Sequence, residues 1–144
     1  MRKGETGLAT VVAGVLTAGV VLGVGGCATK PHGNAAVAQL CAKITTDNSA
    51  ISVANEVRLG TQTPAAGGAV LVTMAGVLNS DANEAQNDGF PEVAASTFQL
   101  GTAVSTLASD VQRVDPTAET NDQTNIAVES QRLAAACTTD EQND

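Results

Sequence analysis

Prolines at positions 64, 91 and 116 divide the chain beyond residue 34 into four segments, and this division constrains the fold more than any other feature. Proline is favoured in the first turn of a helix, because its missing N–H would have no partner there. Within each segment, apolar residues recur at intervals of three and four, which is the period of an α-helix. The sequence therefore predicts four amphipathic helices joined by short connections.

The boundaries of these helices follow from local signals. The first is expected as one helix from 35 to 59, with Gly60 as its stop. The second opens at Thr63-Pro64, where the threonine hydroxyl can cap the helix, and ends at the turn 87–89. The third opens at 90–92 and ends at 115–116. The fourth is expected to start between 117 and 120, because residues 120–123 resemble a capping box. The predicted apolar stripes contain Val37, Leu40, Cys41, Ile44 and Ile51; Val70, Leu71, Met74, Val77, Leu78 and Ala85; Val93, Leu100, Val104, Leu107, Val111 and Val114; and Ile126, Leu133 and Cys137.

Four amphipathic segments with short connections predict an all-α fold, a small antiparallel four-helix bundle with up-down-up-down topology. The bundle domain is expected over residues 35–137, followed by a flexible polar tail over 138–144. Residues 51–53 and 70–72 could each be a strand fragment. Both lie inside longer helical patterns, and neither is flanked by hairpin turn residues, so the helical interpretation is preferred.

The N-terminal part has a different pattern. Arg2 and Lys3 are followed by an apolar run from Leu8 to Val24, and Gly25-Gly26-Cys27 comes next. Positive charge, an apolar segment and small residues in this order are typical of a secretory signal. The segment resembles the leader of bacterial lipoprotein precursors, whose lipobox usually reads Leu-Ala/Ser-Gly/Ala-Cys. Here it reads Val-Gly-Gly-Cys, with Val24 in place of leucine and Gly25 in place of alanine or serine.

This resemblance covers about a fifth of the chain and implies a specific fate for it. Residues 1–26 would be a cleaved signal helix, and Cys27 would carry diacylglycerol, with acyl chains such as palmitate. Residues 27–34 would form a short tether on the extracytoplasmic face of the cell membrane. The alternatives are an ordinary secretory signal and a retained membrane helix, although the glycines, Thr10 and Thr17 weaken the second. The Ala/Val/Gly-rich, lysine-poor composition also resembles that of small actinobacterial lipoproteins, including mycobacterial ones.

The second informative feature is the cysteine pair Cys41 and Cys137. If Cys27 is lipidated, these two cysteines remain as a pair in a compartment that permits disulfides. In an up-down-up-down bundle, the start of the first helix lies beside the end of the fourth, which is where the two cysteines fall. We therefore expect a Cys41–Cys137 disulfide. The alternative is two buried thiols that pack as small apolar residues.

Composition argues against several functional classes. The net charge of −8 becomes −9 when Arg2, Lys3 and Glu5 leave with the signal, and an acidic domain is a poor binder of nucleic acid. The only aromatic residues are Phe90 and Phe98, which disfavours stacking platforms for sugars or single strands.

The chain offers little for catalysis or metal binding. Its single histidine, His32, lies in the tether, so no zinc site and no catalytic base are expected on the folded domain. Asp81, Glu84, Asp88 and Glu92 could bind calcium, but they are interpreted as a solvated acidic corner. No cofactor or metal is therefore expected.

The functional hypothesis is a lipid-anchored, non-enzymatic interaction or accessory protein of the cell envelope. It would be attached to the membrane through diacylglycerol on Cys27 and would have an envelope protein as partner. The alternative is a carrier that holds a small apolar or lipid ligand between its helices. In either case the connections at 60–64 and 115–120 are expected at the end of the domain far from the membrane, and the turn around Asp88 at the near end.

Overall fold

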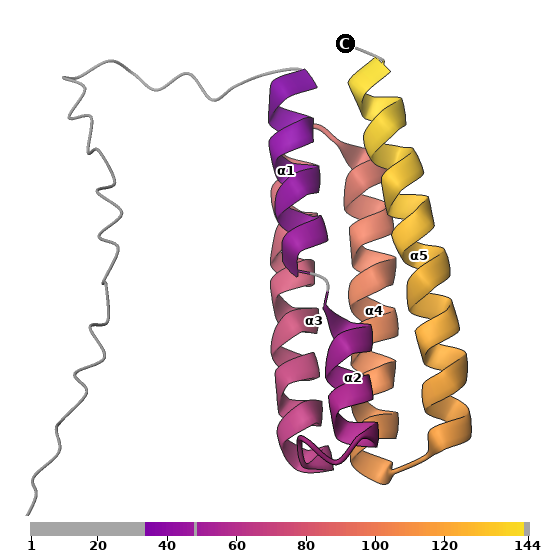
Figure 1. Ribbon diagram of the computed structural model, residues 1–144. Helices are drawn as coiled ribbons and strands as arrows, with labels where there is room; N and C mark the ends of the chain where they lie inside the picture. Colours follow the sequence, from indigo (N-terminus) through magenta and orange to yellow (C-terminus); the bar gives the residue numbers. More distant parts are fainter. Residues whose placement is uncertain (1–33, 48, 143–144) are drawn as a thin grey trace, which may run out of the picture.

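The computed structural model describes residues 34–47 and 49–142, which form five α-helices and no strand. These are α1 (Asn34–Asp47), α2 (Ala50–Arg58), α3 (Pro64–Asn87), α4 (Pro91–Arg113) and α5 (Pro116–Gln142). The prediction of an all-α fold is confirmed. Figure 1 shows α3, α4 and α5 side by side as long rods, with α1 and α2 placed one after the other along the same stack.

The two ends of this stack collect different connections. In Figure 1, α1 begins and α5 ends at the upper end, where the α3–α4 connection also lies. The α2–α3 and α4–α5 connections lie together at the lower end. We call these the proximal and distal ends. This is the grouping of connections that the sequence predicts.

The predicted start and end of α3 and the predicted start of α4 are confirmed. The Thr63 hydroxyl accepts a hydrogen bond from the Ala66 backbone N–H at 3.2 Å, which satisfies one of the free donors at the start of α3. The turn after α3 places Gly89 at φ +90°, in the left-handed region that favours glycine. Pro91 then opens α4.

The core follows most of the predicted stripes. The inward positions of α4 are mostly apolar, and several of these residues have no exposed surface at all: Val93, Leu100, Val104, Leu107 and Val111. Val114 had been placed on the same stripe, but its side chain is 64% exposed, because the backbone leaves the helix there with φ +57°. Met74, Leu78 and Cys41 pack on or in the core as expected.

The first predicted segment is wrong in one respect. The expected single helix from 35 to 59 is two helices, α1 and α2, separated between Asp47 and Ala50. The sequence between 45 and 49 reads Thr-Thr-Asp-Asn-Ser, and such side chains compete with the backbone for hydrogen bonds. The apolar stripe continues across the interruption, because Ile44, Ala50 and Val53 are all buried.

The boundaries of α5 also differ from the prediction. The helix starts at Pro116, and its cap is Asp115, whose Oδ1 accepts hydrogen bonds from Thr117 N at 3.2 Å and Ala118 N at 3.0 Å. The capping box expected at 120–123 lies inside the helix instead. At its other end α5 continues to Gln142, so the helix extends over most of the polar tail expected at 138–144.

Glycines of α3 have unequal roles. A Cβ built on Gly67 would lie 2.2 Å from Val57 Cγ2, and one on Gly68 would lie 2.3 Å from Gln112 Cγ. These two glycines therefore let α2 and α4 approach α3 closely. At Gly76, in contrast, a Cβ would meet nothing within 4 Å.

Candidate functional site

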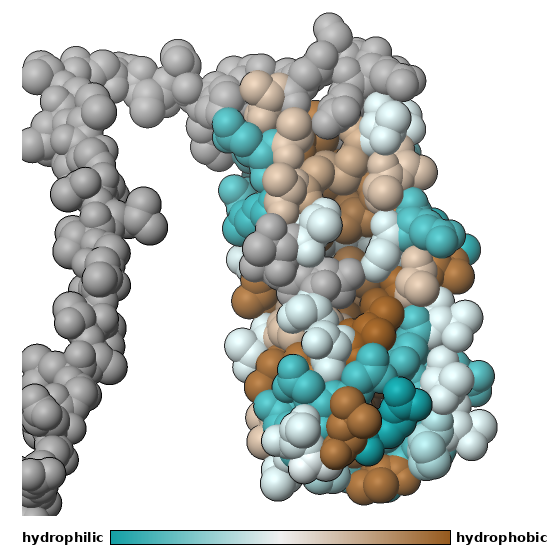
Figure 2. All heavy atoms as spheres, in the orientation of Figure 1, coloured by the Kyte–Doolittle hydropathy of each residue, from teal (hydrophilic) through white to brown (hydrophobic). Residues whose placement is uncertain are grey.

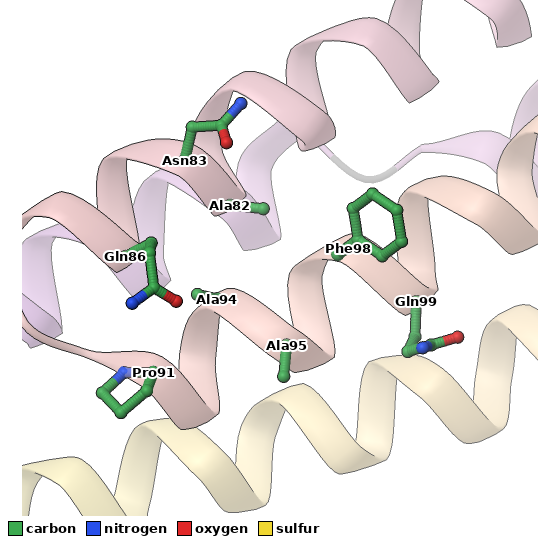
Figure 3. A pocket seen from close by; sticks show the side chains of 8 residues that line it. All are labelled: Ala82, Asn83, Gln86, Pro91, Ala94, Ala95, Phe98 and Gln99. Atoms are coloured by element: carbon green, nitrogen blue, oxygen red, sulfur yellow. The ribbon is translucent and has the colours of Figure 1, made fainter.

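One hollow in the described surface is a groove of about 310 Å³ between α3 and α4, near the proximal end. Figure 3 shows side chains of both helices around it, with Pro91 at one end and the Phe98 ring at the other. Phe98 is 54% exposed, whereas the other aromatic residue, Phe90, is buried. The full lining consists of Ala82, Asn83, Gln86, Pro91, Ala94, Ala95, Phe98 and Gln99.

This groove opens onto a larger uncharged surface. On α3 the exposed residues continue from Asn83 in steps of four, three and four, and on α4 they continue from Phe98 with the same spacing. Residues at this spacing share one face of a helix. The two rows lie side by side, because the Asn79 side chain would contact a Cβ on Gly101 at 2.9 Å. We call this surface the α3–α4 face; it comprises Val72, Gly76, Asn79 and Asn83 with Phe98, Thr102, Ser105 and Ser109.

None of the residues that line the groove or form the α3–α4 face is charged, although the segment 81–92, which supplies half of the groove lining, carries four carboxylates. Residues 59–80 and 93–109 contain no Asp, Glu, Lys, Arg or His. The charged residues of the helices lie at their ends, on the α1–α3 edge and on α5. Since the groove offers only methyl, amide and phenyl groups, it is suited to contact with an uncharged surface rather than to proton transfer.

A second feature is an ion-pair cluster between α1 and α3. Lys43 Nζ lies 2.6 Å from Asp81 Oδ1 and 2.8 Å from Glu84 Oε2. The side chain of Asp81 is 2% exposed, while Lys43 and Glu84 are each 49% exposed. Hydrogen bonds to Asp81 and then to Glu84 raise the pKa of Lys43 above its usual range. The ammonium group is therefore held charged against a buried carboxylate.

This cluster corrects the interpretation of the acidic corner. Asp81 is buried and neutralised from α1, not solvated with the other carboxylates. The signal was present in the sequence, because Asp81 follows Leu78 by three and Leu71 by ten and so lies on the buried stripe of α3. No group of three or more His, Cys, Asp or Glu side chains in the described part of the chain is placed to hold a metal ion.

Carboxylates are also buried near the distal end. Asp110, Glu119 and Asp122 are each less than a tenth exposed. Arg113 pairs with Asp110 within α4. One oxygen of Asp122, Oδ2, is buried without a hydrogen-bond partner. Glu119 and Asp122 lie seven and four residues before Ile126, so they occupy positions on the inward stripe of α5.

Burial changes the acidity of Glu119 and Asp122. Desolvation raises the pKa of Glu119, and the negative charge of Asp115 adds to the effect while Arg58 opposes it. Desolvation also raises the pKa of Asp122, with Arg113 opposing and Asp115 and Glu119 adding to the effect. Arg58 belongs to α2 and Arg113 to α4, so charges from three helices meet here. The sequence does not reveal this cluster, because residues 120–123 have the pattern of a capping box and predict a helix start there.

The predicted disulfide joins α1 to α5 near the proximal end. The structure links Cys41 to Cys137, with their Cα atoms 6.2 Å apart and a sequence separation of 96. Beside the bond lies a groove of about 340 Å³ lined by Cys41, Ala42, Thr45, Ser130, Leu133, Ala134 and Cys137. Figure 2 shows brown and tan apolar surface along this seam in the upper half of the view.

The remaining predicted site residue, Cys27, lies outside the described residues, as do the signal segment, His32 and most of the tether. Of the helices in 34–47 and 49–142, none has the length and apolarity that a membrane span requires. Comparison of the chain with family models, with curated proteins and with solved structures finds no match.

Proposed function

We propose that the chain is a lipid-anchored, non-enzymatic interaction protein on the extracytoplasmic face of the cell membrane. Its anchor is diacylglycerol on Cys27, and residues 35–142 form an up-down-up-down four-helix bundle in which α1 and α2 together make the first arm. The bundle presents the α3–α4 face to a protein partner in the envelope.

The observation that carries this proposal is the arrangement of the proximal end. The tether leads into α1 at Asn34, and the Cys41–Cys137 disulfide closes the seam between α1 and α5 beside that entry. A pull on the tether is therefore resisted by a covalent link to the C-terminal helix. The groove with Phe98 lies near the same end, on the side of the domain and not at its tip.

Anchoring is tested by phase partition of the full chain expressed in a bacterium with lipoprotein processing. The wild-type protein is expected in the detergent phase, and Cys27→Ser is expected in the aqueous phase, because two acyl chains hold a protein to a membrane far better than one or none. Mass spectrometry of the N-terminal peptide should show a mature chain that begins at modified Cys27. Cys41→Ala/Cys137→Ala is the control and should still partition into detergent. Wild-type protein in the aqueous phase would contradict the proposal.

A carrier of an apolar ligand is the second candidate, and the α1–α5 groove is the observation in its favour. Its lining contains Leu133, Ala42 and Ala134 beside the disulfide. Protein purified under mild conditions would then carry an extractable lipid in addition to its anchor. Leu133→Gln should reduce the amount of that lipid, and Val128→Gln on the outer side of α5 should not. Absence of an extractable lipid would leave the interaction protein as the better description.

A further inference from the structure

We infer that the distal segment of α5, residues 116–125, is a pH-controlled latch, which is held against α2 and α4 in acid and opens more often as the pH rises to 7. The rest of α5 stays in place. This inference goes beyond the proposed function, because it concerns a motion of the domain and holds for an anchored or a free chain. It rests on three observations: the absence of an apolar contact in this segment, the carboxylates buried around it and the covalent link at the other end of the helix.

The distal segment of α5 packs through acidic side chains and not through apolar ones. Its two buried residues are Glu119 and Asp122, and the first buried apolar residue of the helix is Ile126. Apolar burial, the main favourable term in folding, therefore contributes little to holding this segment. One oxygen, Asp122 Oδ2, is buried without a hydrogen-bond partner. A charged oxygen in that position favours an open state in which water reaches it.

The charges around these two buried carboxyl groups do not neutralise them. α2 brings Arg58, α4 brings Asp110 and Arg113, and the α4–α5 connection brings Asp115. Residues 64–80 of α3 carry no charged side chain. Both arginines are exposed, and each is bonded within its own helix, so their charge reaches the two carboxyl groups only at a distance. The seam between α2, α4 and α5 therefore buries more negative charge than it compensates.

Proton binding favours the closed position of the latch. Desolvation raises the pKa of both Glu119 and Asp122, Asp115 adds to the effect, and the arginines oppose it. A carboxyl group whose pKa is higher in the closed than in the open state binds protons more readily when closed. Closing should therefore become more favourable as the pH falls from 7 toward the ordinary values near about 4, and level off below them.

The other part of α5 is prevented from following this motion. The disulfide joins Cys137 to Cys41 on α1, and Leu133 is buried beside it. Figure 1 shows the two ends of α5 at opposite ends of the stack, so the covalent link lies far from the buried carboxylates. Opening is thereby confined to the turns that follow Pro116, and it exposes the seam of α2 and α4 that these turns cover.

Hydrogen exchange of the full-length chain, read by mass spectrometry at pH 4.5 and pH 7, tests this inference. Each observed rate is divided by the rate of an unstructured peptide at the same pH, so that the ratio reports opening alone. The protection of residues 119–125 is expected to be about fivefold lower at pH 7 than at pH 4.5. Residues 126–137 of α5 and 97–109 of α4 should keep their protection within about twofold.

Substitutions assign the effect to the two carboxyl groups. Glu119→Gln/Asp122→Asn should give residues 119–125 the same protection at both pH values, because neither side chain can then ionise. Glu92→Gln removes an exposed carboxylate at the opposite end of α4 and should keep the wild-type difference. If the double variant does not fold, Glu119→Gln and Asp122→Asn are measured separately, and each should reduce the difference.

Three results would overturn the inference. The first is equal protection of residues 119–125 at the two pH values in the wild-type chain. The second is a loss of protection at pH 7 that is the same in all helices, because whole-domain unfolding would then replace the local opening. The third is a pH difference that persists when both carboxyl groups are replaced, because other groups would then control the segment.

Discussion

Helices α4 and α5 are of similar length, but different interactions fix each of them against the other helices. The inward stripe of α4 is apolar from Val93 to Val111 except for Thr97, whose hydroxyl donates to Val93 O, and Asp110, which pairs with Arg113. The inward stripe of α5 is apolar from Ile126 onward, at Ile126, Leu133 and Ala136, and carries Glu119 and Asp122 in the part before Ile126. Because apolar burial is the main favourable term in folding, α4 is positioned by packing alone, whereas α5 needs additional links.

This difference shows where the fold is vulnerable. The disulfide fastens α5 to α1 at the proximal end, and α1 is fastened in turn to α3 by Lys43. At the distal end, α5 brings carboxylates that are harder to ionise than usual. The positions of the edge helices α1 and α5 thus depend on specific bonds. For α5, stability also depends on pH.

The largest effect is expected from the disulfide. Cys41→Ala/Cys137→Ala should lower the free energy of unfolding by about 4 kcal/mol, because the bond closes a loop of nearly 100 residues in the unfolded chain. Urea unfolding of residues 28–144 measures this. In the native protein, mass spectrometry without reductant should find no free thiol at either position. Two free thiols in folded protein would show that α5 is held without the bond.

A smaller loss is expected from the link between α1 and α3. Lys43→Met should lower the free energy of unfolding by about 2 to 3 kcal/mol, because it leaves the buried Asp81 carboxylate without its cation. The value lies at the low end of such effects, since Lys43 is half-exposed. Lys43→Met/Asp81→Leu should recover most of the loss in the same unfolding experiment. If the single variant is as stable as the wild type, Asp81 is satisfied by another group.

The distal carboxylates should make stability depend on pH with an unusual sign. Their pKa values are raised on folding, so the folded chain binds protons more readily than the unfolded one. Stability should therefore increase as the pH falls from 7 through the raised values toward the unfolded values near about 4. Glu119→Gln/Asp122→Asn should stabilise the domain at pH 7 by about 1 kcal/mol and flatten this dependence. Thermal unfolding at pH 7 and pH 5 compares the pair with Glu92→Gln, an exposed control. Equal pH dependence in all three proteins would contradict the burial argument.

The smallest effects concern α3, where two glycines make a matched pair. Gly76→Ala should stabilise the domain by about 0.5 to 1 kcal/mol, because alanine is the better helix former and nothing lies near the new methyl group. Gly67→Ala should instead destabilise it by about 1 kcal/mol, because the methyl group would overlap Val57 on α2. Thermal unfolding of the two variants gives the sign of each change. A gain at both positions would mean that α2 moves freely on α3.

Much of the fold could be predicted because the signals are local. Thr63-Pro64, Pro91 and the glycine at 89 act within one turn, and the stripe of α4 has the helical period throughout. The break between α1 and α2 was missed because the apolar stripe continues across it, so the periodicity gave no warning. The sequence misplaces the cap of α5, because residues 120–123 and Asp115 both offer capping side chains. Which of them caps the helix depends on where α4 ends.

The candidate site was less accessible to sequence reasoning. The cysteine pairing could be anticipated, since the helix order brings both residues to one end. The partner of Asp81 could not, because Lys43 is 38 residues away in sequence and reaches it only when α1 lies against α3. The sequence marks Phe98 as one of two aromatic residues, but its place at a groove depends on the α3 side chains, Ala82 among them, that line the same groove.

The sequence by itself determined the helices, the apolar stripe of α4 and the uncharged runs that α3 and α4 expose, because these depend on the chemistry and spacing of neighbouring residues. Only the tertiary structure decided which carboxylates lose contact with water and which of them receive a cation. Solvation and ion pairing depend on what other helices bring within a few ångströms. For α5 that neighbourhood supplies the disulfide at one end and buried acids at the other.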